Sequence, residues 1–374
     1  MYFIGLMSGT SLDGIDAVLA RFAGTSKQSV DLRAHVHHAF TPALRGRLLT
    51  LQQPGPNELH HAFVAAHELA DAYAEAVHDL ISQAGIAPEL PRAIGAHGQT
   101  VRHQPDVGNG QVAYTIQLLN GARLAERVGL DVVCDFRSAD LAAGGQGAPL
   151  VPAFHAALFD QAGLVQAVLN LGGIANLTLL DGRGGLKGFD CGPGNVLLDL
   201  WCERHLGLAY DQDGAWAASG KVDAGLLASL QSEAFFQRWP PKSTGRDLFR
   251  PAWLDSRLME LGQALAPVDV QATLLELTVR CVAEELHRHL PNAVRLLVCG
   301  GGAHNRQLMR RLSELLDGVQ VCSTAGQGLP PQQVEAAAFA WLADAFIAGR
   351  AGNCPAVTGA RRAKVLGALH RGQT

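Results

Sequence analysis

The chain has 374 residues, of which 48% are hydrophobic and 17% are charged, and its formal net charge at pH 7 is −4. This composition excludes a disordered chain, and it gives no electrostatic reason to expect nucleic acid or an anionic membrane as a partner. The length suggests two domains. The 42 glycines follow no three-residue period, which excludes a collagen-like fibre and instead indicates many tight turns.

Two strands open the chain, at residues 2–7 and 15–22, and the small residues between them are typical of a hairpin tip. No basic segment precedes the first strand, so we expect no signal peptide. Helical periodicity then covers 58–84, with Asn57 as a candidate N-cap and Gly85 as the residue that ends the helix. We expect further strands near 92–96 and at 131–136.

Glycine and proline cluster at 144–149, and we predict the boundary between two domains there. An N-terminal domain would comprise residues 1–144 plus 345–374, and a C-terminal domain residues 145–344.

The second half of the chain begins as the first half does, which suggests a duplicated domain. After a helix near 151–161, the strands 165–171 and 174–180 flank Gly172-Gly173 and form a second hairpin. The remaining predicted elements are helices at 196–204, 271–290 and 333–347 and a strand at 294–299 that leads into a helix. Alternating strands and helices predict α/β domains, and the hairpins make each sheet mixed.

Common sequence-local motifs of catalysis are missing. The chain has no GxxxxGK[ST] loop, no GxGxxG fingerprint in a dinucleotide context, no HRD or DFG signature, no GxSxG elbow and no HExxH pair. The histidines at 35–38 and 60–61 lack a matched second cluster, so we interpret them as surface residues rather than as a metal site.

Glycine turns at strand ends are the chemically informative feature. In the first, Gly9-Thr10-Ser11-Leu12-Asp13-Gly14-Ile15-Asp16, backbone N–H groups and hydroxyls could face an anion. No direct metal ligand is assigned, but Asp13 or Asp16 could meet a magnesium ion through water. The alternative is an ordinary hairpin turn.

Three further turns follow the same logic. The second hairpin carries Gly172, Gly173 and Asn176, and Gly300-Gly301-Gly302 could lie against a flat ring such as adenine. In the third turn Asp190, followed by Gly192 and Gly194, places a carboxylate beside a helix N-terminus, where it could act as a general base. Plain turns, or a capping role for Asp190, are the alternatives.

The order of these motifs resembles the actin and sugar-kinase superfamily, and their detail resembles the anhydro-N-acetylmuramic acid kinase family. The blocks that carry the resemblance are Gly5–Asp16, Gly95–Thr100, Asn170–Asn176, Phe189–Asn195, Cys299–Gly302 and Glu335–Ala340, which span nearly the whole chain. Cys191 stands where we expect Thr in this family.

The resemblance implies a two-lobed actin-like fold with mixed sheets, flanking helices and the active site in the interdomain cleft. It implies a cytoplasmic kinase that uses ATP and Mg²⁺ to open the 1,6-anhydro ring of anhydro-N-acetylmuramic acid and to phosphorylate O6, in cell-wall recycling. Another sugar, or a non-catalytic sugar-sensing role, is the alternative. Neither a nucleic acid nor a membrane is an expected partner. A homodimer is a possible assembly.

The resemblance also implies roles for individual residues. Asp190 matches the catalytic aspartate, residues 9–16 match the ATP phosphate segment, and His97, Gln99, Thr100 and Glu335 match segments that face the sugar. Arg137 could pair with the lactyl carboxylate of the sugar, since a fork of donors suits a carboxylate, although a surface ion pair is as good an interpretation.

Overall fold

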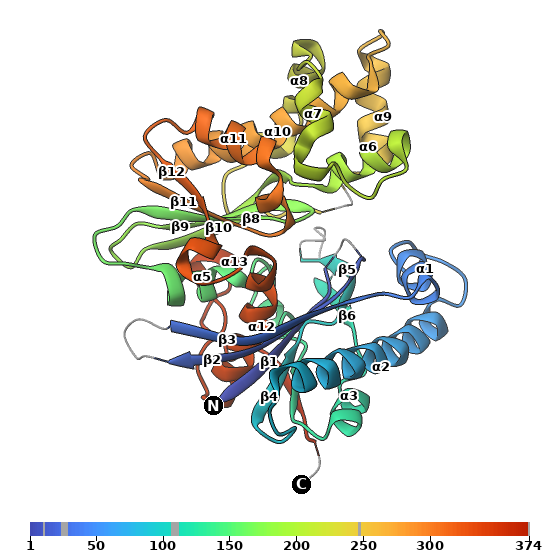
Figure 1. Ribbon diagram of the computed structural model, residues 1–374, viewed down its shortest axis with the longest axis vertical. Coiled ribbons are helices and arrows are strands. Elements are labelled where there is room, and N and C mark those ends of the chain that lie inside the picture. Colours follow the sequence, from blue (N-terminus) through green and yellow to red (C-terminus); the bar gives the residue numbers. More distant parts are fainter. Residues whose placement is uncertain (10–11, 24–28, 106–111, 246–247, 373–374) are drawn as a thin grey trace. The chain divides into compact units, whose positions relative to one another are not determined.

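The computed structural model describes residues 1–9, 12–23, 29–105, 112–245 and 248–372. They form two compact units, Met1–Phe159 with Gln333–Thr374 as unit 1 and Asp160–Gln332 as unit 2 (Figure 1). These bounds differ from the predicted boundaries after residues 144 and 344. The physical reason is that helix α5 (Val151–Phe159) packs against α12 (Val334–Ile347), which keeps both helices in unit 1.

Unit 1 is built on a six-stranded mixed sheet in the order β13-β7-β4-β1-β2-β3. The first three strands form an antiparallel meander, and β4 and β7 continue from β1 in parallel. The strands are β1 (Tyr2–Met7), β2 (Gly14–Ala23), β3 (Ser29–Ala39), β4 (Pro91–Ala96), β7 (Val132–Cys134) and β13 (Ala368–His370), with a separate pair β5 (Gln99–Gln104) and β6 (Tyr114–Leu118). The helices besides α5 and α12 are α1 (Pro42–Thr50), α2 (Glu58–Ala84), α3 (Gly121–Val128), α4 (Ser138–Ala142) and α13 (Pro355–Thr358).

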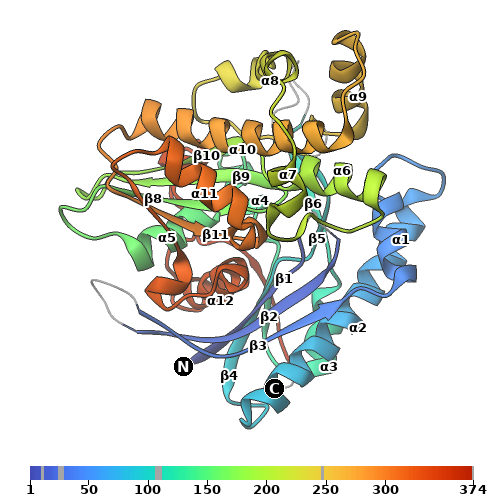
Figure 2. The ribbon, with the colours of Figure 1, turned by 45° about the horizontal axis from the view of Figure 1, so that its top comes forward.

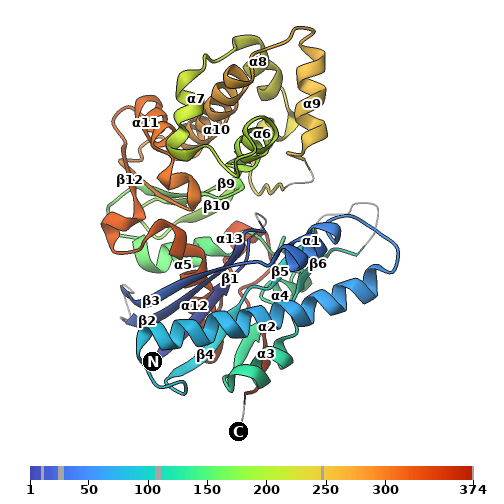
Figure 3. The ribbon, with the colours of Figure 1, turned by 45° about the vertical axis from the view of Figure 1, so that its right-hand side comes forward.

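Helices cover both faces of this sheet. The long helix α2 lies along one face (Figure 3), and its buried stripe, which includes Leu69, Tyr73 and Val77, packs with sheet residues such as Ile4 and Leu19 into one core. The alanine-rich α12 lies against β1, β2 and β4 on the other face.

The close approach of α12 depends on two glycines that are paired in register. Gly5 on β1 lies opposite Gly95 on β4. A Cβ atom on Gly5 would lie 1.8 Å from the Ala336 carbonyl oxygen, and one on Gly95 would lie 2.0 Å from the Phe339 carbonyl oxygen. The helix backbone therefore rests directly on the strands at a position where no side chain fits.

Unit 2 repeats the topology of unit 1. Its sheet has the order β10-β9-β8-β11-β12, with β8, β9 and β10 antiparallel and β11 and β12 parallel to β8, which corresponds strand for strand to β3-β2-β1-β4-β7. The strands are β8 (Gln166–Leu171), β9 (Ile174–Leu180), β10 (Leu186–Pro193), β11 (Arg295–Cys299) and β12 (Gln320–Ser323). The predicted fold class, duplicated α/β units with mixed sheets flanked by helices, is confirmed.

The long helix α10 (Pro267–His289) runs along the unit 2 sheet and contacts β9 and β10 (Figure 2). Its buried face, which includes Leu274 and Val282, joins Leu177 and Phe189 of the sheet in a second core. The other helices are α6 (Val196–Leu206), α7 (Ala215–Ser219), α8 (Ala224–Gln231), α9 (Pro251–Glu260) and α11 (Arg306–Leu315). Among the described residues, none of the helices combines the length and the apolarity that a bilayer span requires.

Candidate functional site

One described residue of the first hairpin turn, Leu12, is held in a strained backbone conformation. Leu12 has a φ of 57°, which is unusual for a branched side chain, and its N–H donates to the Gly9 carbonyl oxygen at 3.3 Å. The side chains of Leu12 and Ile15 are buried in the core of unit 1 and point away from solvent. Thr10 and Ser11 lie outside the described residues. Strain of this kind is often stored at binding sites.

Three neighbouring elements fix the base of this hairpin. The buried Tyr73 hydroxyl of α2 donates to Ser8 Oγ at 2.8 Å, and Ser8 Oγ donates to the Gly98 carbonyl oxygen at 3.2 Å. Gln99 Nε2 donates to the Gly9 carbonyl oxygen at 3.0 Å. The predicted sugar residue Gln99 is therefore fully buried beneath the predicted phosphate segment.

His97 connects the same hairpin to Arg137. Its Nδ1 donates to the Ser8 carbonyl oxygen at 3.2 Å, and its Nε2 accepts from Arg137 Nη2 at 3.0 Å. Burial and the nearby Arg137 guanidinium lower the pKa of His97 to about 3, so the ring is neutral. Arg137 Nη1 also donates to the Gly147 carbonyl oxygen at 2.7 Å. Both ring nitrogens of His97 are thus engaged within the protein.

The other two predicted sugar residues lie on neighbouring elements of unit 1. Thr100 on β5 accepts from Gln117 Nε2 through its Oγ1 at 3.2 Å. Glu335 is half-buried in the first turn of α12, one helical turn before Phe339, whose ring centroid lies 4.7 Å from that of His97. Spacing of four residues places Glu335 and Phe339 on the same face of the helix, toward His97.

The two acidic residues of the first hairpin have different surroundings. Asp13 is exposed, whereas Asp16 on β2 is half-buried. Asp16 Oδ1 lies 3.0 Å from His35 Nε2 and 3.1 Å from His37 Nδ1. Asp16 is therefore engaged with strand β3, and of the two carboxylates the one of Asp13 is better exposed toward a hydrated ion.

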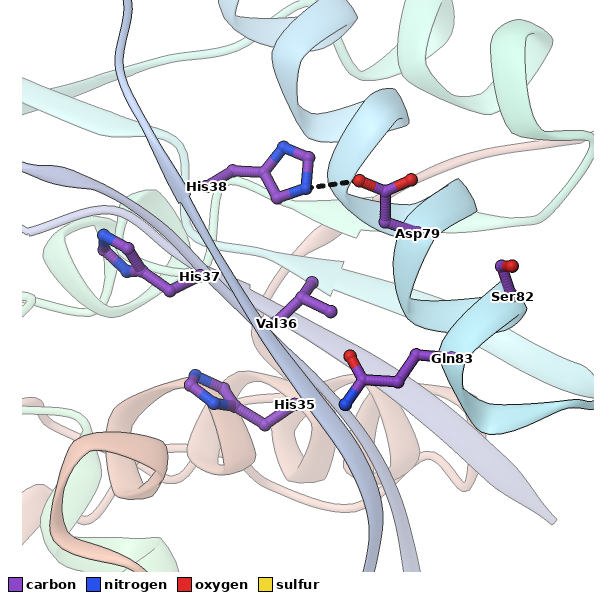
Figure 4. A pocket seen from close by; sticks show the side chains of 7 residues that line it. All are labelled: His35, Val36, His37, His38, Asp79, Ser82 and Gln83. Atoms are coloured by element: carbon purple, nitrogen blue, oxygen red, sulfur yellow. Dashed lines mark ion pairs between the residues drawn. The ribbon is translucent and has the colours of Figure 1, made fainter.

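Strand β3 lies at the sheet edge beside an open pocket of about 550 Å³ (Figure 4). The side chains alternate along the strand, with Val36 and His38 on the α2 side and His35 and His37 on the other. His38 Nε2 pairs with Asp79 Oδ2 at 2.7 Å. Throughout the described ranges no group of three or more His, Cys, Asp or Glu side chains could hold a metal ion.

In unit 2 the second hairpin and the turn after β10 are joined by backbone hydrogen bonds. The N–H groups of Gly194 and Val196 donate to the Gly173 carbonyl oxygen, and Asn195 N–H donates to that of Gly172. A Cβ atom on Gly194 would lie 2.3 Å from the Gly172 carbonyl oxygen. The predicted second phosphate hairpin and the start of α6 therefore form one compact structure.

The triple glycine after β11 lies against this structure. A Cβ atom on Gly300 would lie 2.5 Å from Asn170 Oδ1, and one on Gly302 would lie 2.7 Å from Leu171 Cβ. Gly301 is exposed, and its nearest such contact is Asn195 Nδ2 at 3.9 Å. Gly300 and Gly302 are thus required for packing, while Gly301 leaves the open backbone surface that a flat ring would need.

Asp190 lies on strand β10, in register with Asn176 of β9. The sequence predicted a turn around Asp190, Gly192 and Gly194, but the strand continues to Pro193, with a β-bulge at Cys191. Bulges often redirect a neighbouring side chain beside an active site. Gly192 also packs closely, since its Cβ atom would lie 2.8 Å from Phe236 Cε1.

Sequence reasoning missed the segment that holds Asp190. The Asp190 N–H donates to the Lys242 carbonyl oxygen at 3.1 Å, and the Thr244 N–H donates to Asp190 Oδ2 at 2.8 Å. The available signal was the run Pro240-Pro241-Lys242-Ser243-Thr244-Gly245, in which polar residues stand between turn formers.

Comparison with known proteins identifies the relatives of this chain. Residues 1–372 match the family model described as anhydro-N-acetylmuramic acid kinase. The chain is 52% identical over 370 residues to the anhydro-N-acetylmuramic acid kinase of Cupriavidus pinatubonensis and 53% identical over 373 residues to that of Variovorax paradoxus, with 98% of each chain covered. Among solved structures, the activator of the 2-hydroxyisocaproyl-CoA dehydratase from Clostridium difficile aligns with 91% of this chain and 93% of its own, at 12% identity and a TM-score of 0.47.

Proposed function

The chain belongs to the anhydro-N-acetylmuramic acid kinase family, and we propose that it catalyses the reaction for which the family is named. In this reaction water adds to C1 of the anhydro sugar, the C1–O6 bond breaks, and O6 takes the γ-phosphoryl group of ATP. The products are N-acetylmuramic acid 6-phosphate and ADP. The observation that carries the proposal is the whole-chain family match combined with Asp190 on a bulged strand of unit 2, in register with Asn176 of the second glycine hairpin.

Asp190 is the general base in this proposal. One carboxylate oxygen, Oδ2, accepts the Thr244 N–H, which fixes the plane of the group. The carboxylate takes a proton from the attacking water, and the phosphoryl group captures the leaving oxygen. A second catalytic acid, which ordinary glycoside hydrolysis requires, is then unnecessary.

The glycine turns fit ATP because glycine leaves backbone N–H groups and open backbone surface for a ligand. In the first hairpin the apolar side chains point into the core, and in the triple glycine Gly301 leaves an open surface for the adenine ring. When bound, ATP supplies the phosphoryl group, and Mg²⁺ would neutralise its charge through water held near Asp13. Positioning and electrostatics are the main contributions of the protein in such transfers.

For the sugar we propose Arg137, Thr100 and Glu335 as contacts, with His97 and Gln99 holding them and the hairpin in place. The network from His97 to Arg137 and Ser8 supports this division of roles. The need for ATP and the seven cysteines, none of them in a disulfide, support a cytoplasmic location.

The decisive experiment incubates the protein with ATP, Mg²⁺ and anhydro-N-acetylmuramic acid and measures ADP together with the sugar phosphate. We expect equal amounts of both products. A panel of other anhydro and free amino sugars tests whether the enzyme is specific. ADP formation no faster than in a sample without sugar would refute the proposed activity.

A further inference from the structure

The main chain at Lys242–Thr244 makes two hydrogen bonds with Asp190, one to its backbone N–H and one to its carboxylate. The Lys242 carbonyl oxygen accepts from the Asp190 N–H at 3.1 Å, and the Thr244 N–H donates to Asp190 Oδ2 at 2.8 Å. No regular helix or strand includes residues 242–245. The position of the Thr244 N–H therefore depends on what holds this irregular segment in place.

The side chain of Lys242 provides that anchor. It is 2% exposed, and its Nζ lies 3.1 Å from Oε1 of Glu285, a helix α10 residue whose side chain is 4% exposed. The same ammonium group lies 4.9 Å from the ring centroid of Phe235. A further cation and a histidine ring approach the carboxylate of Glu285, with Arg288 Nη1 at 3.0 Å from Oε1 and His289 Nε2 at 3.2 Å from Oε2.

Stability alone is a poor explanation for this arrangement. Removing two charges from water is costly, and replacing a buried ion pair with apolar side chains of similar volume is often neutral or stabilising. Such a pair does, however, fix the position of the segment that carries the lysine, because the ammonium group has to reach one particular carboxylate. Here the pair ties an irregular segment to the longest helix of unit 2.

We propose that Lys242 is a positioning residue for the reaction: its buried contact with Glu285 fixes the segment whose Thr244 N–H orients the carboxylate of Asp190. The inference rests on the proposed role of Asp190 as the base. It adds a supporting residue whose segment contacts Asp190 through the main chain.

The test replaces both partners with apolar residues, in Lys242→Met/Glu285→Leu, so that neither member of the buried pair is left alone. Arg288, which also contacts Glu285, is 32% exposed and can be solvated by water. We expect kcat to fall at least about tenfold, because small displacements of a reacting group reduce rates strongly, while KM for ATP and for the sugar changes less than about twofold. The melting temperature should stay near that of the wild type. Hydrogen exchange in peptides covering Lys242–Gly245 should become faster, since the anchor of the segment is gone.

Arg311→Met is the matched control. It breaks another ion pair on α10, in which Arg311 Nη2 lies 3.0 Å from Oε2 of the buried Glu276. We expect a lower melting temperature with unchanged kcat and unchanged exchange at Lys242–Gly245.

Two outcomes separate this inference from the proposed function. If the double variant keeps wild-type kcat and exchange while Asp190→Asn is inactive, the positioning role is overturned and the catalytic role of Asp190 stands. If Asp190→Asn keeps wild-type turnover, the base lies elsewhere and the proposed function of this residue fails first. A double variant that unfolds at assay temperature would show that the pair serves stability, which also overturns the positioning role.

Discussion

Asp190 stands one residue before a β-bulge, and the Thr244 N–H fixes one of its carboxylate oxygens. Replacing Asp190 with Asn preserves the shape of the side chain but removes its ability to take a proton. We expect turnover to fall by about 10²–10⁴-fold, the usual contribution of general base catalysis. Binding of a non-hydrolysable ATP analogue, measured by calorimetry, should change little. Wild-type turnover in this variant would place the base on another residue.

The bulged residue Cys191 is fully buried and lines a cavity of about 230 Å³ together with Cys281 and Glu285. Among the described residues Glu285 Oε2 has no hydrogen-bond partner, although His289 Nε2 lies 3.2 Å away. A Thr hydroxyl at position 191 would therefore find a buried acceptor on the cavity wall.

We accordingly expect Cys191→Thr to be more stable than the isosteric Cys191→Val by about 1 kcal/mol, the usual net value of a hydrogen bond. Urea unfolding of the two variants measures the difference. Equal stability, or a more stable Val variant, would mean that the hydroxyl gains no partner in this cavity.

At the scale of elements, the contact of α12 with β1 and β4 depends on Gly5 and Gly95. An added Cβ would overlap with helix carbonyl oxygens on either strand. Gly95→Ala should therefore destabilise unit 1 by about 1–3 kcal/mol or more, the typical cost of overpacking. Gly46→Ala is the control, because its Cβ would meet nothing within 4 Å in the interior of α1, and there Ala favours the helix. Thermal unfolding distinguishes the two, and equal melting temperatures would contradict the packing argument.

Elements with a clear period or a clear ending were predictable from the sequence. The helix at 58–84 ends where expected, with Gly85 at a φ of 62°, and both hairpins lie where alternating apolar residues flank small ones. Asn57 precedes this helix but makes no side-chain cap, since it adopts the left-handed conformation with a φ of 55°. Local patterns therefore fixed the element but not the detail of its first turn.

The elements that were missed owe their structure to neighbours far along the chain. Strand β3 carries a run of histidines with weak strand propensity, and it forms because β2 pairs with it along its length. Strand β10 contains Gly188, Gly192 and Pro193, and it persists because β9 pairs with it on both sides of the bulge. The support for Asp190 from Lys242 and Thr244 joins residues more than 50 positions apart, which no local pattern reveals.

For the whole molecule, buried histidines predict an uneven response to acid. In unit 1 burial lowers the pKa of His97 and His155 to about 3 and that of His103 to about 4, whereas in unit 2 the pKa of His289 is lowered by burial. Below about pH 6.5 these histidines are protonated in the unfolded chain but stay neutral in the folded protein. The free energy of unfolding therefore falls as pH falls toward 4.

Each such histidine should cost up to about 1.4 kcal/mol per pH unit in this window. We expect unit 1 to lose more stability than unit 2 between about pH 7 and about pH 5. Hydrogen exchange along a urea series resolves peptides of the two units, and His155→Phe should reduce the slope for unit 1. Equal slopes in the two units would contradict the assignment to these rings.

The division of the chain also sets an order of events during synthesis. All of unit 2 lies within Asp160–Gln332, but unit 1 needs α12 and β13, which the ribosome makes after unit 2. Synthesis proceeds at about 5–20 residues per second, so the faces of β1 and β4 that α12 will cover stay uncovered for roughly 10–35 s while unit 2 is made. The second unit can therefore fold on the ribosome before the first is complete, and a nascent chain stalled before Val334 would present an uncovered sheet face to chaperones.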